Sequence, residues 1–350
     1  MFVNSRTTIA IPPGETIKEQ LEYRELSQKE FATRMGMSEK HISNLIRGNV
    51  HLTSEVALRL EMVLGVPAKF WNNLEAIYRE DLEKIRLENQ MEDDFEILKK
   101  IPYNEMVKNG WLEKVSGKSE KVIQLRKFFE VANLEILSNP QINKIACRRM
   151  SITKKSDYCL LAMVQRAKIE ARERNIGLIN IKKLEKNIEI IRDMTIKNPN
   201  DVIENLVEIL GKCGIALILL PNLEGSFLQG ATFYDGKKII IGMTARGKDA
   251  DIFWFSLFHE IGHIIKGHIN NSNGTSEEDE NEADKFARDI LIPKQEFKLF
   301  VESGDFSKEA IKLFADKIKV SRGIVVGRLQ KDGYIKYSWN NELKEEYKIS

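Results

Sequence analysis

The sequence predicts a mainly α-helical protein with a small α+β part. Through most of the first 214 residues, apolar side chains recur at the i, i+3 and i+4 spacing of helices with one buried face. Beyond that point, the apolar run IALILL and the stretch ATFYDGKKIII, with Asp-Gly at its centre, are typical of strands and a hairpin turn. We therefore predict an N-terminal helical bundle, a helical middle region and a C-terminal domain with a small antiparallel sheet.

Changes in composition along the 350 residues predict four regions. They are a helical bundle at residues 1–90, a helical spacer at 91–199, the domain with the strands at 200–300 and a helical extension at 301–350. The net charge of +2 hides an uneven distribution, since residues 96–175 contain 17 Lys and Arg against 9 acidic residues. Such a basic segment suits a polyanion or an acidic partner, although a solvated helical surface is the commoner explanation.

Composition also excludes several kinds of protein. The chain has only three cysteines, without paired spacing, which indicates neither a disulfide framework nor a cysteine-based zinc site (Cys147, Cys159 and Cys213). Its first residues lack the continuous apolar segment of a signal peptide. No apolar run approaches the roughly 20 residues of a membrane-spanning helix. We therefore expect a cytoplasmic protein without a membrane partner.

Two short helices are predicted near the N-terminus. Ser27 is the expected N-cap of the first, with Glu30 at the capping-box position, and Gly36 ends it. Ser38 is the expected N-cap of the second, over residues 39–46. Two helices at this spacing have the helix-turn-helix form, in which the second helix enters the major groove of DNA.

The residues expected to contact DNA are polar side chains on these two helices. Asparagine and arginine read adenine and guanine edges, whereas lysine and serine suit phosphates or mixed contacts. The alternative is a small helical bundle that only packs or dimerises, and spacing alone does not separate the two. The expected DNA contacts are Gln28, Glu39, Lys40, Ser43, Asn44 and Arg47.

Residues 12–80 resemble a known family of DNA-binding proteins. The segments LSQKEFATRMGMS, ISNLIRG and FWNNLEA are similar to those of the HigA-type antitoxins in the Xre helix-turn-helix family. The resemblance implies binding to a double-stranded DNA operator as a homodimer. Residues 1–79 are nearly neutral, with 10 Lys and Arg against 9 Glu, so we expect modest affinity and strong salt dependence.

The segment WFSLFHEIGHIIKGH, at residues 254–268, contains a metal-binding pattern. His259 and His263 lie one helical turn apart on the same face. With Glu260 they form H-E-x-x-H, in which two imidazoles bind zinc and the glutamate is the general base. The sequence therefore predicts Zn²⁺ as cofactor and Glu260 as catalytic residue. His268 lies outside the i+4 face, so we expect a surface or gating residue rather than a ligand.

A third zinc ligand is expected from the helix over residues 276–293. Glu280 and Asp284 stand at i and i+4, which suits a glutamate on the metal and an aspartate that accepts a hydrogen bond from a ligand histidine. Glu282 is the alternative ligand. Three further acids are weaker candidates, and the cluster also fits a solvated helix N-terminus (Glu277, Glu278 and Asp279).

The two segments FWFSLFHEIGHIIKGH and ENEADKFARDILIP resemble the ImmA/IrrE family of zinc metallopeptidases. The resemblance covers residues 200–335 and implies a gluzincin-like fold, in a family whose known members cleave transcriptional repressors. Asparagine is common in the family where Asp284 stands here. The roles carried over are zinc ligation by His259, His263 and Glu280, general-base catalysis by Glu260, and support of a ligand by Asp284.

Two expectations concern the substrate. The predicted strand at residues 239–244 would offer its edge to an extended peptide. Arg246 lies where it would bind substrate or stabilise an oxyanion, or equally where it would form a structural ion pair.

These observations predict a DNA-binding zinc-dependent endopeptidase that cleaves a transcriptional repressor or antitoxin in a stress-response or mobile-element switch. The alternative is a non-proteolytic HigA-like regulator or antitoxin whose peptidase-like domain senses a metal or ligand. A third reading is an antitoxin that uses its C-terminal half to mask a toxin. The complete pentad favours the enzyme, because a pure sensor has no need of Glu260.

Overall fold

The computed structural model is 65% helical with small sheets, which confirms the predicted fold class. None of the helices in the described ranges combines the length and apolar character needed to cross a membrane. Arg246 and Cys147 lie outside the described residues. The structure describes residues 3–5, 7–89, 91–139, 155–197, 199–224, 230–244, 249–270 and 275–345.

The chain divides into two compact units, which are described separately. The first unit comprises Met1–Glu96 and Val115–Ile123, and the second comprises Ile97–Lys114 and Gln124–Ser350. The region boundaries near residues 90, 199 and 300 remain predictions.

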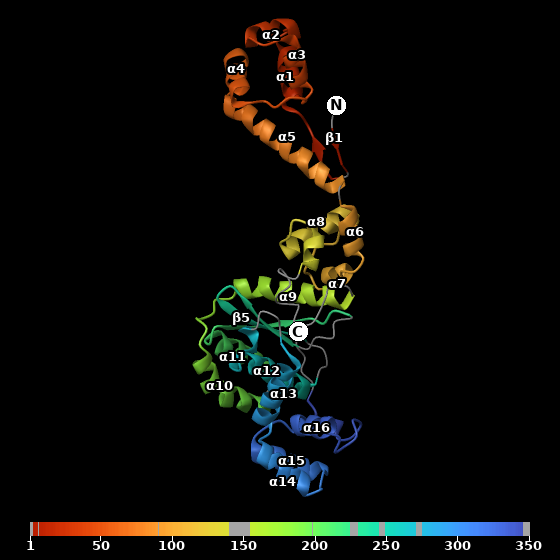
Figure 1. The fold of residues 1–350 in the computed structure, drawn as a ribbon, viewed down its shortest axis with the longest axis vertical. Helices are drawn as coiled ribbons and strands as arrows, with labels where there is room; N and C mark the ends of the chain where they lie inside the picture. Colours follow the sequence, from red (N-terminus) through yellow and green to blue (C-terminus); the bar gives the residue numbers. More distant parts are fainter. Residues whose placement is uncertain are drawn as a thin grey trace. The chain divides into compact units, whose positions relative to one another are not determined.

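A small bundle of five helices forms most of the first unit (Figure 1). Its core contains aromatic and branched side chains with no exposed surface, including Phe31, Ile42 and Trp71. A two-stranded antiparallel sheet precedes the helices. The elements are β1 (Val3–Asn4), β2 (Ile9–Ala10), α1 (Pro13–Tyr23), α2 (Gln28–Met35), α3 (Glu39–Ile46), α4 (Ser54–Leu64) and α5 (Ala68–Asn89).

Local capping determines where α2 and α3 begin and end. The Ser27 and Ser38 hydroxyls accept hydrogen bonds from the Glu30 and His41 backbone N–H groups, as the sequence predicted. Gly36 ends α2 in the left-handed region, with φ of 62°. These contacts give the predicted helix-turn-helix, and α3 has the predicted bounds.

Close packing of α1 holds α3 in place. A Cβ atom at position 14 would lie 1.9 Å from the Ile46 carbonyl oxygen, so only glycine fits at this contact.

Four shorter elements follow α5 along the chain: α6 (Glu92–Leu98), α7 (Tyr103–Lys108), α8 (Lys118–Phe129) and η1 (Leu134–Ser138).

The second unit contains a three-stranded sheet and most of the remaining helices. Its α/β part consists of α9 (Lys155–Glu173), α10 (Ile181–Asp193), η2 (Met194–Ile196), α11 (Pro199–Gly211), β3 (Ile215–Leu220), β4 (Gly230–Asp235), β5 (Lys238–Thr244), α12 (Ala250–Ile265), η3 (His268–Asn270) and α13 (Glu277–Leu291). The C-terminal part consists of α14 (Lys294–Glu302), α15 (Lys308–Ile318), α16 (Arg322–Lys331) and η4 (Asn341–Leu343).

The sheet differs from the prediction in one respect. The strand order is β3–β5–β4, with β4 antiparallel to β5 across the predicted Asp235-Gly236 turn. However, β3 lies parallel to β5, with Ile215 opposite Ile239, so the sheet is mixed rather than purely antiparallel. Because β5 is the central strand, both of its edges are paired, and the expectation that it offers an edge to substrate was wrong.

Helices cover both faces of this sheet (Figure 1). Ile239 and Ile241 of β5 belong to the same apolar cluster as Trp254 and Phe258 of α12. On the other face, position 242 lies against Ala167 of α9. Side chains that alternate along β5 are therefore buried on both faces of the sheet, and α12 packs against one of these faces.

Candidate metal centre

Small residues bring α12 and α13 close together. A Cβ atom at position 262 would lie 3.2 Å from the Ala283 Cα and 3.1 Å from the Phe286 ring. Ala283 and Ala287 on α13 are completely buried. Because α12 has a glycine here and α13 turns Ala283 and Ala287 towards it, the two helices approach closely and their polar residues at neighbouring turns can meet.

Three of the predicted ligands meet at one point between these helices. The Nε2 atoms of His259 and His263 are 3.0 Å apart. The Glu280 carboxylate lies 3.4 Å from His259 Nε2 through Oε2 and 3.8 Å from His263 Nε2 through Oε1. Tetrahedral zinc with ligands at about 2.0–2.2 Å separates its ligand atoms by about 3.3–3.5 Å. The donor atoms and their spacing therefore fit a zinc ion.

Asp284 orients the first histidine. Its Oδ1 lies 2.8 Å from His259 Nδ1, which leaves Nε2 directed towards His263 and Glu280. Such a carboxylate–histidine pair sets the tautomer and the direction of a metal ligand.

The charges of this cluster are strongly coupled. Burial disfavours the charged form of His259, but hydrogen bonds to Asp284 and Glu280 outweigh burial and raise its pKa to about 10. Hydrogen bonds from His259 and His263 hold the pKa of the Glu280 carboxyl far below its usual range. The hydrogen bond from His259 likewise lowers the pKa of Asp284. The two carboxylates therefore favour the protonated form of His259.

Glu260 lies beside the three donor residues but is held by a different element. It is 6% exposed, and its Oε2 accepts a 2.5 Å hydrogen bond from the Thr232 hydroxyl of β4. A Cβ atom at position 230 would lie 2.9 Å from Glu260 Cγ, so a side chain there would displace the Glu260 carboxylate. Neither Thr232 nor Gly230 was predicted from the sequence. Their only signal was a hairpin directly before the metal-binding helix.

His268 was expected to be a surface or gating residue rather than a ligand, and the surface position was wrong. It is 6% exposed, because η3 directs the chain back towards α12. Its Nδ1 lies 3.1 Å from His263 Nδ1. Its Nε2 lies 3.3 Å from Glu282 Oε2 and 3.5 Å from Asp279 Oδ1. Within the part of the chain that is described, Glu282 thus contacts His268, whereas Glu280 faces the two other histidines.

The remaining acids at the start of α13 form the helix terminus. The Ser276 hydroxyl accepts from the Asp279 N–H, and the Asp279 side chain accepts from the Ser276 N–H, which completes a capping box. Thr275 donates to Glu280 Oε1 at 2.5 Å. Glu277 is the first residue of the helix, and Glu278 follows it.

The polar residues expected to contact DNA lie on one short segment of the first unit. Gln28 begins α2, and the other five lie on α3 or directly after it. All are exposed or half-buried, which leaves them accessible to a partner.

Comparison with known proteins assigns both parts of the chain. A helix-turn-helix family matches residues 17–71, and the IrrE N-terminal-like domain matches residues 234–330, a range that includes His259, His263 and Glu280. The protein is a fusion of a helix-turn-helix domain and an IrrE-like domain. The predicted resemblance to both families is thereby confirmed, and the chain combines a DNA-binding domain with a peptidase-like one.

Several relatives resemble the helix-turn-helix part of this fusion. This chain is 36% identical over 63 residues to the uncharacterised HTH-type transcriptional regulator YddM of Escherichia coli. The match covers 18% of this chain and 67% of that protein. The chain is 41% identical over 63 residues to antitoxin HigA-1 of Vibrio cholerae and spans 59% of it. A solved HigA-family addiction module antidote protein from Coxiella burnetii is 25% identical, with a TM-score of 0.23 over 24% of this chain and 92% of that one.

Proposed function

We propose that the IrrE-like domain is a zinc-dependent endopeptidase that cleaves a transcriptional repressor or antitoxin in a stress-response or mobile-element switch. The proposal rests on one observation: the residues that would bind the metal and the residue that would act as general base are different, and they lie side by side. Two histidines and Glu280 converge on one point, while Glu260 is held beside them by Thr232. A site that only stores or senses metal does not need this fourth group.

In this proposal His259, His263 and Glu280 hold the zinc ion. When bound, zinc supplies a Lewis acid that polarises the scissile carbonyl. Glu260 accepts the proton of the attacking water and delivers it to the departing amine. Thr232 directs the Glu260 carboxylate by its hydrogen bond. Asp284 and His268 are positioning residues, because each contacts the Nδ1 atom of a ligand histidine.

The substrate would bind along β4 rather than β5. In the described sheet β4 pairs only with β5, so its outer edge has free backbone groups. Thr232 and Gly230 of the same strand contact Glu260. An extended polypeptide added to this edge would therefore pass the general base, in the β-augmentation mode.

The helix-turn-helix domain would bring the peptidase to an operator. We assign DNA contacts to Gln28, Glu39, Lys40, Ser43, Asn44 and Arg47, and we expect the protein to bind double-stranded DNA as a homodimer. The repressor or antitoxin to be cleaved would then be one that acts at the same operator.

Metal analysis of purified variants tests the site. We expect about one zinc per chain in the wild-type protein and in Glu282→Ala, and none in Glu280→Ala. Glu282→Ala is the matched control, since it removes a carboxylate from the same helix. Equal zinc in Glu280→Ala and wild type would refute this ligand set.

A non-proteolytic regulator is the second candidate, because the relatives of the helix-turn-helix part are a transcriptional regulator and an antitoxin. It predicts that zinc binds, that operator affinity changes with zinc, and that Glu260→Gln behaves as wild type. The peptidase predicts instead that Glu260→Gln keeps its zinc and no longer cleaves a repressor co-expressed with it.

A further inference from the structure

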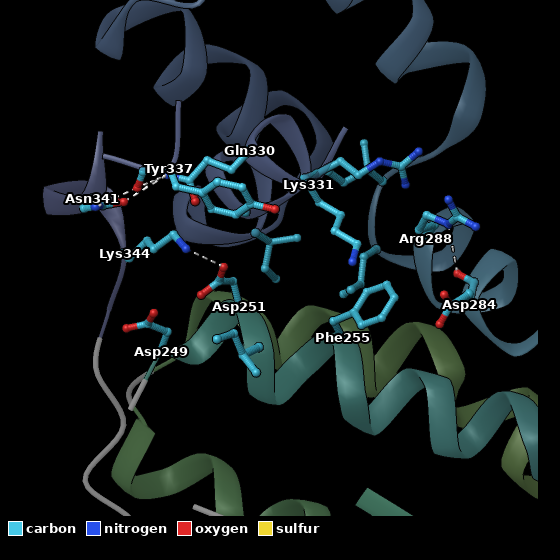
Figure 2. A pocket seen from close by; sticks show the side chains of 16 residues that line it. Asp249, Asp251, Phe255, Asp284, Arg288, Gln330, Lys331, Tyr337, Asn341 and Lys344 are labelled. Carbon is cyan, nitrogen blue, oxygen red and sulfur yellow. Dashed lines mark hydrogen bonds and ion pairs between the residues drawn. The ribbon is translucent and has the colours of Figure 1, made fainter. Parts of the chain in front are cut away.

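A cavity of about 640 Å³ lies directly behind the candidate metal centre. It is lined by residues of α12, α13, α16 and the segment that ends at Lys344 (Figure 2). Asp284 lines this cavity and also contacts His259 Nδ1, whereas His259 Nε2 faces the other ligands. The cavity is therefore on the opposite side of His259 from the point where zinc would bind.

The walls of the cavity carry opposite charges at its two ends. Figure 2 shows Asp249 and Asp251 at one end, with Lys344 paired to Asp251, and Lys331 and Arg288 towards the other, with Asp284 beside Arg288. Each end therefore keeps one net charge of its own sign. Between them the lining is apolar, and consists of Ile252, Phe255, Leu291, Ile292 and Ile324. Such a volume, with a few polar groups around an apolar surface, is typical of small-molecule sites of about 300–1,000 Å³.

The acidic end contains an unsatisfied acceptor. Asp251 is only 8% exposed, and its Oδ2 pairs with Lys344 Nζ at 2.9 Å. Its Oδ1 has no hydrogen-bond partner among the described residues, but this atom is completely buried and does not face the cavity. Burial raises the pKa of this carboxyl, and Lys344 only partly opposes the effect. Asp249, the N-cap of α12, makes no side-chain capping bond. Asp249 is therefore the carboxylate at this end that a cationic donor in the cavity would reach.

The basic end contains two cations that form no ion pair among the described residues. Arg288 donates only from Nε to the Asp284 backbone carbonyl, at 3.2 Å. Lys331 is exposed at the end of α16. In contrast, Arg328, which also lines the cavity, already pairs with Asp332 at 2.5 Å. Arg288 and Lys331 lie near the Asp284 carboxylate without forming an ion pair with it, so both still have donors for a second anionic group.

We propose that this cavity binds a zwitterionic small molecule of the amino-acid or short-peptide class. The ligand's ammonium group would donate to Asp249, beside the Asp251–Lys344 ion pair. Its carboxylate would accept from Arg288 and Lys331, and its apolar body would cover Phe255 and the neighbouring isoleucines. The acidic end complements a free amine, the basic end a free carboxylate, and the apolar lining the apolar body between them.

Binding there changes zinc affinity, because Arg288 and Lys331 flank the residue that orients His259. Both cations act on the Asp284 carboxylate. A ligand carboxylate that takes over Arg288 and Lys331 changes the field at Asp284, and a change in this support alters metal affinity. By linkage, zinc changes the affinity for the ligand by the same factor. This coupling rests on the proposed zinc site, whereas ligand binding itself does not.

The test uses the full chain and three peptides in isothermal titration calorimetry: trileucine, N-acetyl-trileucine and trileucine amide. Trileucine should bind, and each capped peptide should bind about tenfold more weakly, because it lacks one charged contact. Lys331→Gln should weaken trileucine binding and reduce the penalty of amidation, because only the Arg288 contact to the carboxylate remains, while the penalty of N-acetylation stays at about tenfold. Lys285→Gln is the matched control, since it removes an exposed lysine of α13 that does not line the cavity.

Two results would overturn the proposal. One is no binding of trileucine at about 10 mM, a concentration that detects even millimolar affinity. The other is a Lys331→Gln variant that binds all three peptides as wild type does. Glu260→Gln should bind trileucine as wild type does, and a loss of binding in that variant would place the peptide at the metal centre instead. Absence of peptidase activity leaves these outcomes unchanged, so the two proposals fail separately.

Discussion

The DNA-binding helix and the metal centre use polar residues in opposite ways. On α3 the predicted contacts are exposed or half-buried, and the helix is held by its Ser38 cap and by apolar residues on its other face. In the metal centre the polar side chains are mostly buried and contact one another across α12, α13 and β4. Substitutions on α3 should therefore act locally and additively, whereas substitutions in the metal centre should act through their neighbours.

The largest effect is expected for Glu260→Gln. Loss of the general base should lower the cleavage rate of the repressor or antitoxin by about 10²–10⁴-fold. Zinc content should stay the same, because Glu260 is not one of the three converging donors. Rate and metal content are measured on the same preparation, with Glu282→Gln as control. A Glu260→Gln protein that loses its zinc would show that Glu260 also supports metal binding, so that the two functions do not reside on separate residues.

The second prediction tests whether His268 positions the ligand His263. His268→Ala should lower zinc affinity by about 10–100-fold, because it removes the contact to His263 Nδ1. Competition with a chromophoric chelator measures the affinity, and the visible spectrum of the cobalt(II) protein reports ligand geometry. His51→Ala, at an exposed histidine of the first unit, is the control. Unchanged affinity and spectrum would return His268 to a purely structural role.

Arg47→Ala tests the exposed residues that are predicted to contact DNA. An arginine that contacts a base or phosphate contributes about 1–3 kcal/mol, so operator affinity should fall about tenfold or more. Zinc content and cleavage should not change. Fluorescence anisotropy at two salt concentrations measures the binding, and Lys69→Ala on α5 is the control for lost charge. A simultaneous loss of cleavage would show that the domains do not act separately.

The smallest effect concerns pH and the metal-free protein. The pKa of His259 rises from 6.5 to about 10, so its contribution to stability is complete below pH 6.5 and is lost as pH rises through 10. The pKa of Glu280 is lowered from 4.5, so its contribution is present above pH 4.5 and is lost as pH falls. The pair should therefore stabilise most between pH 4.5 and 6.5.

Urea midpoints of chelator-treated wild type and His259→Gln measure this contribution. The difference between them should be largest near pH 5–6 and should shrink towards pH 10. A difference that does not vary over this range would contradict a protonated His259 in the metal-free protein.

Local features of the sequence determined much of the molecule. Caps and apolar spacing predicted α2 and α3, because a serine N-cap and a left-handed glycine act within one helical turn. Asp235-Gly236 predicted the hairpin of β4 and β5 for the same reason. The two histidines of the pentad face one point because i and i+4 share a helix face.

Only the tertiary structure decided how these pieces combine. The partner of β5 on its second edge is β3, a choice that no local pattern specifies, and it leaves β4 as the edge strand. A short turn returns His268 to His263, although helical spacing placed it off the ligand face. Thr232 reaches Glu260 from another element. Periodicity records which face of an element is buried, whereas the neighbour it is buried against depends on contacts between residues distant in the chain.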